Sequence, residues 1–108
     1  MDDKIYILQS EICKIFTNPT RLKIIDLLSD GEKTVTELCN ELKMRQPVVS
    51  LNLALLRDKR IVTTRRNGTE VYYSITNKKL LKACAIVREI ILDQLADSKK
   101  IIEKFNRR

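Results

Sequence analysis

The stretch TVTELCNELKMRQPVVSLNLALLRDKRIVTTRRNGTEVYYSI, residues 34–75, decides the fold of this chain. Its first part carries the Thr-x-x-Glu pattern of Thr34 and Glu37, a capping box that predicts the start of a short helix. After a tight turn, Pro47 predicts the start of a second helix. Two runs of β-prone residues on either side of an Asn-Gly pair then predict a hairpin. The predicted order is therefore helix, turn, helix and hairpin.

Helical periodicity also extends to both sides of this stretch. Before it, apolar residues at three- and four-residue spacing predict one helix, and Asn18 with Pro19 predicts the cap of the next. After it, Thr76 or Asn77 is expected to cap a long last helix whose apolar positions lie close to a seven-residue repeat. The predicted elements are helices over residues 4–16, 19–28, 34–43, 47–59 and 77–105 and strands over residues 61–66 and 69–75. The side chains expected to face inward are Leu22, Ile25 and Leu28 in the second helix and Val49, Leu53 and Leu56 in the fourth, with Leu55 as a further candidate.

The composition is typical of one small globular domain, residues 1–108, with 44% hydrophobic and 32% charged residues. The chain has 21 Lys and Arg against 14 Asp and Glu, a net charge of +7 that favours a polyanionic partner but does not identify it. No apolar run approaches the roughly 20 residues of a membrane-spanning helix. The acidic start and the three cysteines without framework spacing indicate a reduced protein of the cytoplasm.

The residue types give little support to catalysis. The chain has no histidine to serve as a general base and only two glycines, too few for a glycine-rich phosphate loop. Its carboxylates are scattered over the predicted helix surfaces. We therefore expect neither an enzyme nor a bound cofactor.

Four blocks of the sequence resemble the ArsR/SmtB family of winged helix-turn-helix repressors. They are NPTRLKII (residues 18–25), TVTEL (34–38), QPVVS (46–50) and VYYSI (71–75). The resemblance implies a mainly α winged helix-turn-helix fold of about five helices and a two-stranded wing, in a homodimer joined through residues 4–16 and 77–105. It also implies a double-stranded DNA operator, with the fourth helix in the major groove and the wing on the backbone or minor groove. In such repressors a ligand or a redox event usually releases the operator.

The residue types at the start of the fourth helix support DNA binding independently of the resemblance. Polar side chains there supply donors and acceptors suited to base edges and phosphates, and a leucine there could meet a thymine methyl. Two adjacent arginines in the hairpin are suited to phosphates. The candidate DNA-binding residues are Arg45, Gln46, Val48, Ser50, Leu51 and Asn52 in the helix and Arg65, Arg66, Asn67 and Thr69 in the wing. The alternative is that Ser50 bonds only to local backbone and that the arginine pair is merely solvated.

The positions at which relatives bind metals do not carry metal ligands in this chain. One family site uses a Cys-x-Cys pair at the start of the third helix, where this chain has Thr34 and Thr36. Cys39 alone cannot build a three-coordinate thiolate site and is expected to be a small apolar helix residue. The other family site uses histidines on the last helix, but this chain has Lys79 at one ligand position and no histidine. We therefore expect no metal inducer at these sites, and the inducer stays unknown.

Two other interpretations are consistent with the sequence. Cys13 and Cys84 fall on the first and last helices, so oxidation of this pair could change the packing across a dimer and release DNA. The simpler interpretation is that both are core cysteines. The second alternative is a winged-helix module that binds another protein instead of an operator. Polarity at positions 45, 46, 50 and 52 favours a DNA groove over an apolar docking surface.

Overall fold

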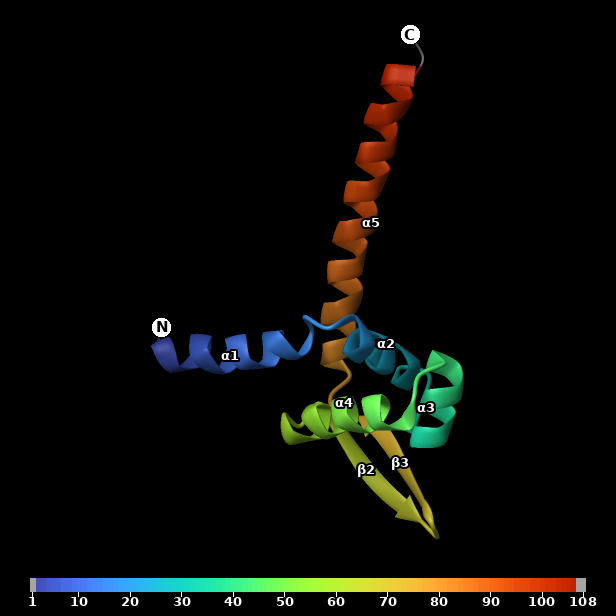
Figure 1. The fold of residues 1–108 in the computed structure, drawn as a ribbon. Helices are drawn as coiled ribbons and strands as arrows, with labels where there is room; N and C mark the ends of the chain where they lie inside the picture. The colour runs from blue at the N-terminus through green and yellow to red at the C-terminus, as the bar shows by residue number, and fades with distance from the viewer. Residues whose placement is uncertain (1, 107–108) are drawn as a thin grey trace. The chain divides into compact units, whose positions relative to one another are not determined.

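The computed structural model describes residues 2–106, apart from the side chain of Phe105, in two compact units divided between Asn77 and Lys78 (Figure 1). Each predicted helix is found, with its start within two residues of the expected position. The first unit contains, in order, α1 (Asp3–Ile15), α2 (Pro19–Leu28), β1 (Lys33–Thr34), α3 (Val35–Leu42), α4 (Gln46–Asp58), β2 (Val62–Asn67) and β3 (Glu70–Ile75), and the second unit is α5 (Lys79–Asn106).

Local capping interactions explain where α2 and α3 begin. The Asn18 Oδ1 atom accepts from the N–H groups of Thr20 and Arg21 at 2.8 and 3.2 Å. At the start of α3, the Glu37 N–H donates to Thr34 Oγ1 at 3.2 Å and the Thr34 N–H donates to Glu37 Oε1 at 3.1 Å. Side chains therefore satisfy amide groups that have no partner within the helix. Both predicted caps are confirmed.

The core of the first unit is formed by α2, α3, α4 and the sheet. Its most deeply buried side chains are Ile24, Ile25, Leu38, Val49, Leu53, Leu56 and Val62. Two predictions about this core are wrong, because Leu22 is 39% exposed and Leu55 is 42% exposed. The buried pair Ile24 and Ile25 sets the inward direction of α2, which turns Leu22 toward the surface. Leu55 precedes the buried Leu56 by one residue and lies on the flank of α4.

The wing is part of a three-stranded antiparallel sheet with the strand order β1-β3-β2. The sequence pattern predicts only the hairpin, because β1 has two residues and no alternation to recognise. In β1, Thr34 pairs with Tyr72 of β3. Thr34 is also the N-cap of α3, so one residue belongs to both the sheet and the helix-turn-helix.

The turn of the hairpin lies one residue later than the Asn-Gly pair suggests. Asn67 pairs with Glu70, which leaves Gly68 and Thr69 as the two central residues. Gly68 has φ of 64°, a value that glycine adopts without the steric cost of a Cβ. A glycine with positive φ at the first central position is the requirement of a type II′ turn.

Both α3 and α4 are followed by a residue in the left-handed backbone conformation. Lys43 has φ of 55° and Arg60 has φ of 59°. After α4, the Ile61 N–H donates to the Leu56 carbonyl at 2.9 Å, and after α3 the Cys39 carbonyl accepts the equivalent bond at 3.2 Å. These bonds define Schellman caps, in which glycine is the preferred residue because a Cβ costs roughly 1 kcal/mol there. Each helix therefore ends on a basic residue at a cost in stability.

The long helix α5 begins two residues later than predicted, at Lys79. The prediction that Thr76 caps it is wrong, because Thr76 Oγ1 donates to the carbonyls of Arg60 and Ile61 at 2.6 and 3.1 Å. Thr76 thus fastens the end of β3 to the segment that leads into β2. The alternative prediction, that Asn77 caps α5, stays a prediction, and in the first turn the Lys82 N–H donates to the Lys78 carbonyl at 3.4 Å.

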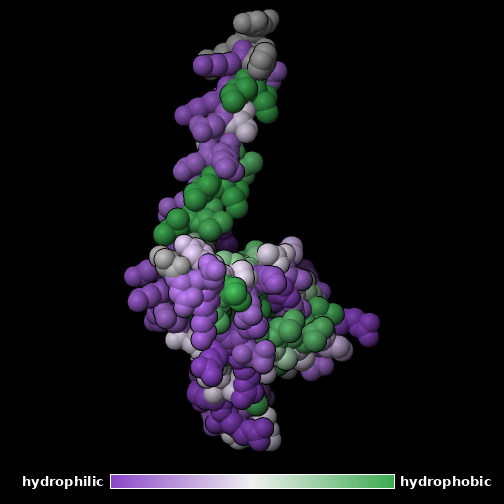
Figure 2. Space-filling view, turned by 90° about the vertical axis from the view of Figure 1, so that its left-hand side faces the viewer, coloured by the Kyte–Doolittle hydropathy of each residue, from purple (hydrophilic) through white to green (hydrophobic). Residues whose placement is uncertain are grey.

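Large apolar side chains are exposed on α5 and α1. Figure 2 shows hydrophobic side chains gathered along α5. Those of α5 are 49–60% exposed and are Ile86, Val87, Ile90, Ile91, Leu92, Leu95, Ile101 and Ile102. Those of α1 are Ile5, Tyr6, Ile7, Leu8 and Ile12. Within residues 2–106, no helix has the length and hydropathy needed to cross a membrane.

Candidate nucleic-acid interface

The first two turns of α4 present a row of exposed side chains. Arg45 is the N-cap residue, with extended backbone at φ −71° and ψ 143°, and its exposed side chain makes no capping bond. Val48 is 44% exposed and Leu51 is 64% exposed, the highest value among the large hydrophobic side chains of the described residues. An apolar side chain beside exposed polar ones such as Gln46 fits a base edge that carries a methyl group.

Gln46 and Ser50 form a hydrogen-bonded pair on this surface. Gln46 Nε2 donates to Ser50 Oγ at 2.7 Å across one helical turn. The bond orients both side chains and leaves the Gln46 carbonyl oxygen and the Ser50 hydroxyl proton to face a partner. Because the partner of Ser50 is a side chain, the alternative in which Ser50 bonds only to local backbone is wrong.

Asn52 does not belong to the exposed row. Its side chain is only 8% exposed, so the prediction that it lies on an outer face of α4 is wrong. Its Nδ2 atom donates to the Val48 carbonyl at 2.8 Å, and its Oδ1 atom accepts from Arg21 Nη1 at 3.5 Å. A buried amide that is bonded at both ends supports α4 from behind and is not placed to contact a base.

Arg21 connects this buried amide to the end of α1. Its Nε atom donates to the Ile15 carbonyl at 2.7 Å and its Nη2 atom donates to the Lys14 carbonyl at 3.3 Å. One guanidinium therefore joins the last turn of α1, the first turn of α2 and the middle of α4 through Asn52. Arg21 lies in the block NPTRLKII, but no pattern in the sequence marks it as a structural link. A half-buried arginine needs acceptors, but nothing in the sequence indicates where they are.

Arg65 is held by an acidic side chain from outside the hairpin. Its Nε atom donates to Glu32 Oε2 at 2.7 Å, and its Nη2 atom contacts Glu32 Oε1. Its guanidinium carbon also lies 4.6 Å from the ring centroid of Tyr72, the cross-strand partner of Arg65. The guanidinium is thus paired on its edge and packed on its face. A phosphate contact of Arg65 stays a prediction, and it would have to compete with Glu32 for the guanidinium.

Arg66 lies on the opposite face of the hairpin. Successive strand residues point to opposite faces, so Arg66 shares its face with Thr64 and with Tyr73, the cross-strand partner of Thr64. Arg66 is exposed and makes no ion pair within residues 2–106. At the tip, Asn67 and Thr69 are also exposed. Of the two wing arginines, Arg66 is therefore the one without an acidic partner among the described residues.

The Glu32–Arg65 pair should make stability depend on acid pH. The hydrogen bond from Arg65, aided by its charge, lowers the pKa of Glu32, and Glu32 raises the pKa of Arg65 in return. Since the carboxyl pKa is lowered on folding, the pair stabilises the protein above the unfolded pKa, and this contribution is lost as pH falls through the lowered value. We expect Tm to fall less steeply with acidification in Glu32→Gln than in the wild type, as measured by thermal denaturation at a series of pH values. Parallel curves would show that the pair contributes nothing.

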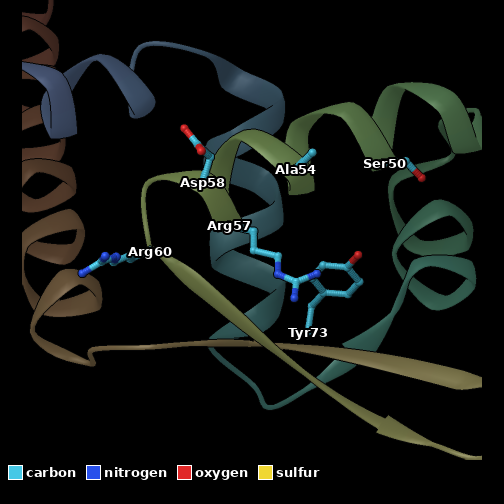
Figure 3. A pocket seen from close by; sticks show the side chains of 6 residues that line it. All are labelled: Ser50, Ala54, Arg57, Asp58, Arg60 and Tyr73. Carbon is cyan, nitrogen blue, oxygen red and sulfur yellow. The ribbon is translucent and has the colours of Figure 1, made fainter.

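An open cleft lies between α4 and β3, with a volume of about 510 Å³. Figure 3 shows Arg57 extending from α4 toward Tyr73, whereas Asp58 and Arg60 extend away from this pair. The lining residues are Ser50, Ala54, Arg57, Asp58, Arg60 and Tyr73. No sequence pattern marks Arg57 or Tyr73 as binding residues, because only the fold brings the last turn of α4 beside the middle of β3.

The cysteines differ in exposure. Cys13 is exposed, and Cys39 and Cys84 are half-buried. Cys13 is therefore not a core residue of the first unit. The interpretation that both Cys13 and Cys84 are core residues is thus wrong for Cys13 within this unit. The pairing of Cys13 with Cys84 under oxidation stays a prediction. Among residues 2–106 there is no cluster of three or more His, Cys, Asp or Glu side chains that could hold a metal ion.

The sequence and the fold are similar to those of known bacterial regulators. The family model described as "Bacterial regulatory protein, arsR family" matches residues 18–64. The arsenical resistance operon repressor of Staphylococcus xylosus is 38% identical over 71 residues, 66% of this chain and 68% of the relative. That of Staphylococcus aureus is 32% identical over 99 residues, 92% of this chain and 84% of the relative. The solved structure of the homodimeric winged helix-turn-helix DNA-binding domain of Mb0332 from Mycobacterium bovis matches with TM-score 0.78 and 29% identity, covering 86% of each chain.

The helix-turn-helix of α3 and α4 and the hairpin beside it define a winged helix-turn-helix DNA-binding protein, as predicted. The chain belongs to the arsR family of bacterial regulatory proteins. It is a DNA-binding transcriptional regulator and not an enzyme, in agreement with the sequence analysis.

Proposed function

We propose that two copies of the chain form a symmetric repressor that binds a palindromic operator. The observation that carries this proposal is the exposed first half of α4, where the Gln46–Ser50 pair is oriented by its hydrogen bond and the buried Asn52 supports the helix. The α4 residues that face the major groove in this proposal are Arg45, Gln46, Val48, Ser50 and Leu51. The wing residues that contact the backbone or minor groove are Arg66, Asn67 and Thr69.

The chemistry of these side chains divides them into two roles. The amide of Gln46 can donate to and accept from one adenine edge, and the exposed Leu51 can cover a thymine methyl, so these residues would read sequence. Arg45 and Arg66 are exposed cations, which bind phosphates of any sequence. Specificity would therefore come from α4, and a large share of the affinity would come from the cations at its N-terminus and in the wing.

The apolar surfaces of α1 and α5 support a dimer. Eight large hydrophobic side chains of α5 are 49–60% exposed, and such an area in water costs free energy that association would recover. The similar domain from Mycobacterium bovis is homodimeric. A two-fold axis would place two α4 helices in successive major grooves, with half-sites about one helical turn apart.

The signal that releases DNA is proposed to differ from that of metal-binding relatives. Thr34 stands at the position of a family cysteine ligand, and its hydroxyl is already used in the capping box with Glu37. The chain has no histidine for the second family site. A thiolate or imidazole metal site at these positions would therefore need ligands that this sequence does not have.

The experiment that tests the proposal compares one α4 variant with one wing variant. We expect Gln46→Ala to lose about tenfold in affinity for a duplex from upstream of the chain's own coding sequence, and to lose less on an unrelated duplex. We expect Arg66→Ala to weaken binding to both duplexes alike and to reduce the salt dependence by about one counterion. Fluorescence anisotropy titrations at several salt concentrations measure both effects.

Wild-type protein that binds the two duplexes equally at every salt concentration would contradict sequence-specific repression from that region. If Arg66→Ala changed the preference between duplexes and Gln46→Ala did not, the assigned roles of helix and wing would be reversed. Lys23→Gln is the charge control, because Lys23 is exposed on α2 and outside both groups of residues.

A further inference from the structure

We propose that the cleft between α4 and β3 binds a phosphate group of the DNA backbone, with Arg57 and the Tyr73 hydroxyl as its donors. The site deepens the proposed function, on which it rests. It adjoins the exposed row of α4 at Ser50, and it adds a contact where the last turn of α4 approaches the sheet (Figure 3).

The donors in the cleft suit a phosphate. Arg57 presents a planar guanidinium whose parallel N–H groups can bind two phosphate oxygens at once, and Tyr73 extends from β3 toward α4 with its hydroxyl at the end. Arg57 makes no ion pair or side-chain hydrogen bond within residues 2–106, so its donors are not already used. The carboxylate of Asp58 lines the cleft but extends away from Arg57 and Tyr73, so it does not occupy the guanidinium.

The backbone conformation of Arg60, which Lys43 shares at the end of α3, is a second observation at this cleft. Arg60 has φ of 59° in a Schellman cap where glycine would avoid the steric cost. Residues kept in such a conformation tend to cluster at functional sites. The backbone hydrogen bonds of this cap do not need a side chain, so the feature that Arg60 adds is a further cation among the residues that line the cleft, at its edge and pointing away from Arg57 and Tyr73.

The distribution of charge across the hairpin agrees with this placement. Tyr73 belongs to the hairpin face that carries the unpaired Arg66. On the other face, Glu32 neutralises Arg65. Among the described residues, Arg57 and Arg66 are thus two cations without acidic partners on the side of the hairpin that holds the α4 cleft, where a nucleic-acid strand that crosses α4 and the wing would pass.

The test uses Arg57→Gln, Tyr73→Phe and Arg60→Gly in the full chain, with Lys23→Gln as the matched charge control. A backbone contact does not depend on sequence, so we expect Arg57→Gln to weaken binding to the upstream duplex and to an unrelated duplex by the same factor, about threefold to tenfold. The slope of log affinity against log salt should fall by about one, and Tyr73→Phe should weaken both duplexes by about twofold to threefold. Lys23→Gln should leave the slope nearly unchanged.

Arg60→Gly removes both the charge of Arg60 and the strain in its backbone. DNA affinity measures the effect of the charge, and Tm measures the effect of the strain. We expect the Tm of this variant to rise by roughly 4 °C, because strain is removed, while its affinity for both duplexes falls about twofold to fivefold. A variant that is stabilised without loss of affinity would show that Arg60 has no part in binding. A variant that is not stabilised would overturn the argument from strain.

Equal salt slopes for Arg57→Gln and Lys23→Gln would overturn the cleft as a phosphate site, even if the wild type prefers its upstream duplex. A wild type without that preference would instead contradict the proposed operator and leave the slope comparison valid on either duplex. A third experiment measures Tm in the presence of inorganic phosphate. If phosphate raises Tm in the wild type but not in Arg57→Gln, while the DNA slopes stay equal, the cleft binds a free anion and not the DNA backbone.

Discussion

Leu95→Asp is expected to produce a monomer and to weaken operator binding by about a hundredfold or more. Leu95 is 60% exposed on α5, in the middle of its apolar residues. An aspartate there would have to lose its water on association, and the two-fold axis would bring a second carboxylate toward it. Each half of the operator would then be bound by a separate chain, without the gain from linking two binding events. Sedimentation velocity and anisotropy titration on the same samples measure both effects.

Ala96→Asp is the matched control for this variant. It introduces the same carboxylate one residue later, about 100° around the helix, in the row that already holds Glu89 and Glu103 at seven-residue spacing. It should sediment as a dimer and bind DNA nearly as the wild type does. If Leu95→Asp also remained a dimer at micromolar concentration, α5 would not form the interface. A wild type that sediments as a single chain would exclude the dimer itself.

Arg21→Met is expected to lower the free energy of unfolding by about 2–3 kcal/mol, because three bonds from one charged group are lost together. The variant leaves the Ile15 carbonyl without its donor and Asn52 without the partner of its carbonyl oxygen. Urea denaturation measures the change. Lys23→Met, two residues along α2 on its exposed side, should change stability by less than about 0.5 kcal/mol.

A double-mutant cycle with Asn52→Leu shows whether the two side chains act together. Contacting residues in one network couple by about 0.5–3 kcal/mol, so the double variant should be less destabilised than the two single losses added together. Strict additivity would mean that Arg21 acts only on the end of α1. Because Asn52 bonds to the Val48 carbonyl, we also expect Arg21→Met to weaken DNA binding when measured well below its unfolding temperature.

The parts of the fold that could be predicted are those set by short-range chemistry. The caps at Asn18 and Thr34 act within three residues, so the sequence alone locates the starts of α2 and α3. The surroundings of Asn52 and Arg65 could not be predicted, because they depend on distant partners. Asn52 is buried against Arg21, 31 residues earlier, and Arg65 is paired with Glu32, 33 residues earlier.

In the candidate DNA-binding surface too, local features could be predicted and long-range contacts could not. The exposed positions on the first half of α4 follow from helical periodicity, and Gln46 and Leu51 lie where that pattern places them. Strand alternation places Arg65 and Arg66 on opposite faces, but it does not tell which face meets an acidic side chain. Tyr73 could be found only when the register with Thr64 and the approach of α4 were known.

The double membership of Thr34 has a consequence for how the protein meets its partner. Its backbone pairs with Tyr72 in the sheet, and its side chain caps α3, so the wing cannot swing without releasing a helix cap. The spacing between the two surfaces that would contact the double helix is therefore set before they meet. A protein whose binding surfaces are already in place loses little conformational entropy on association. A larger part of the free energy of each contact therefore contributes to affinity.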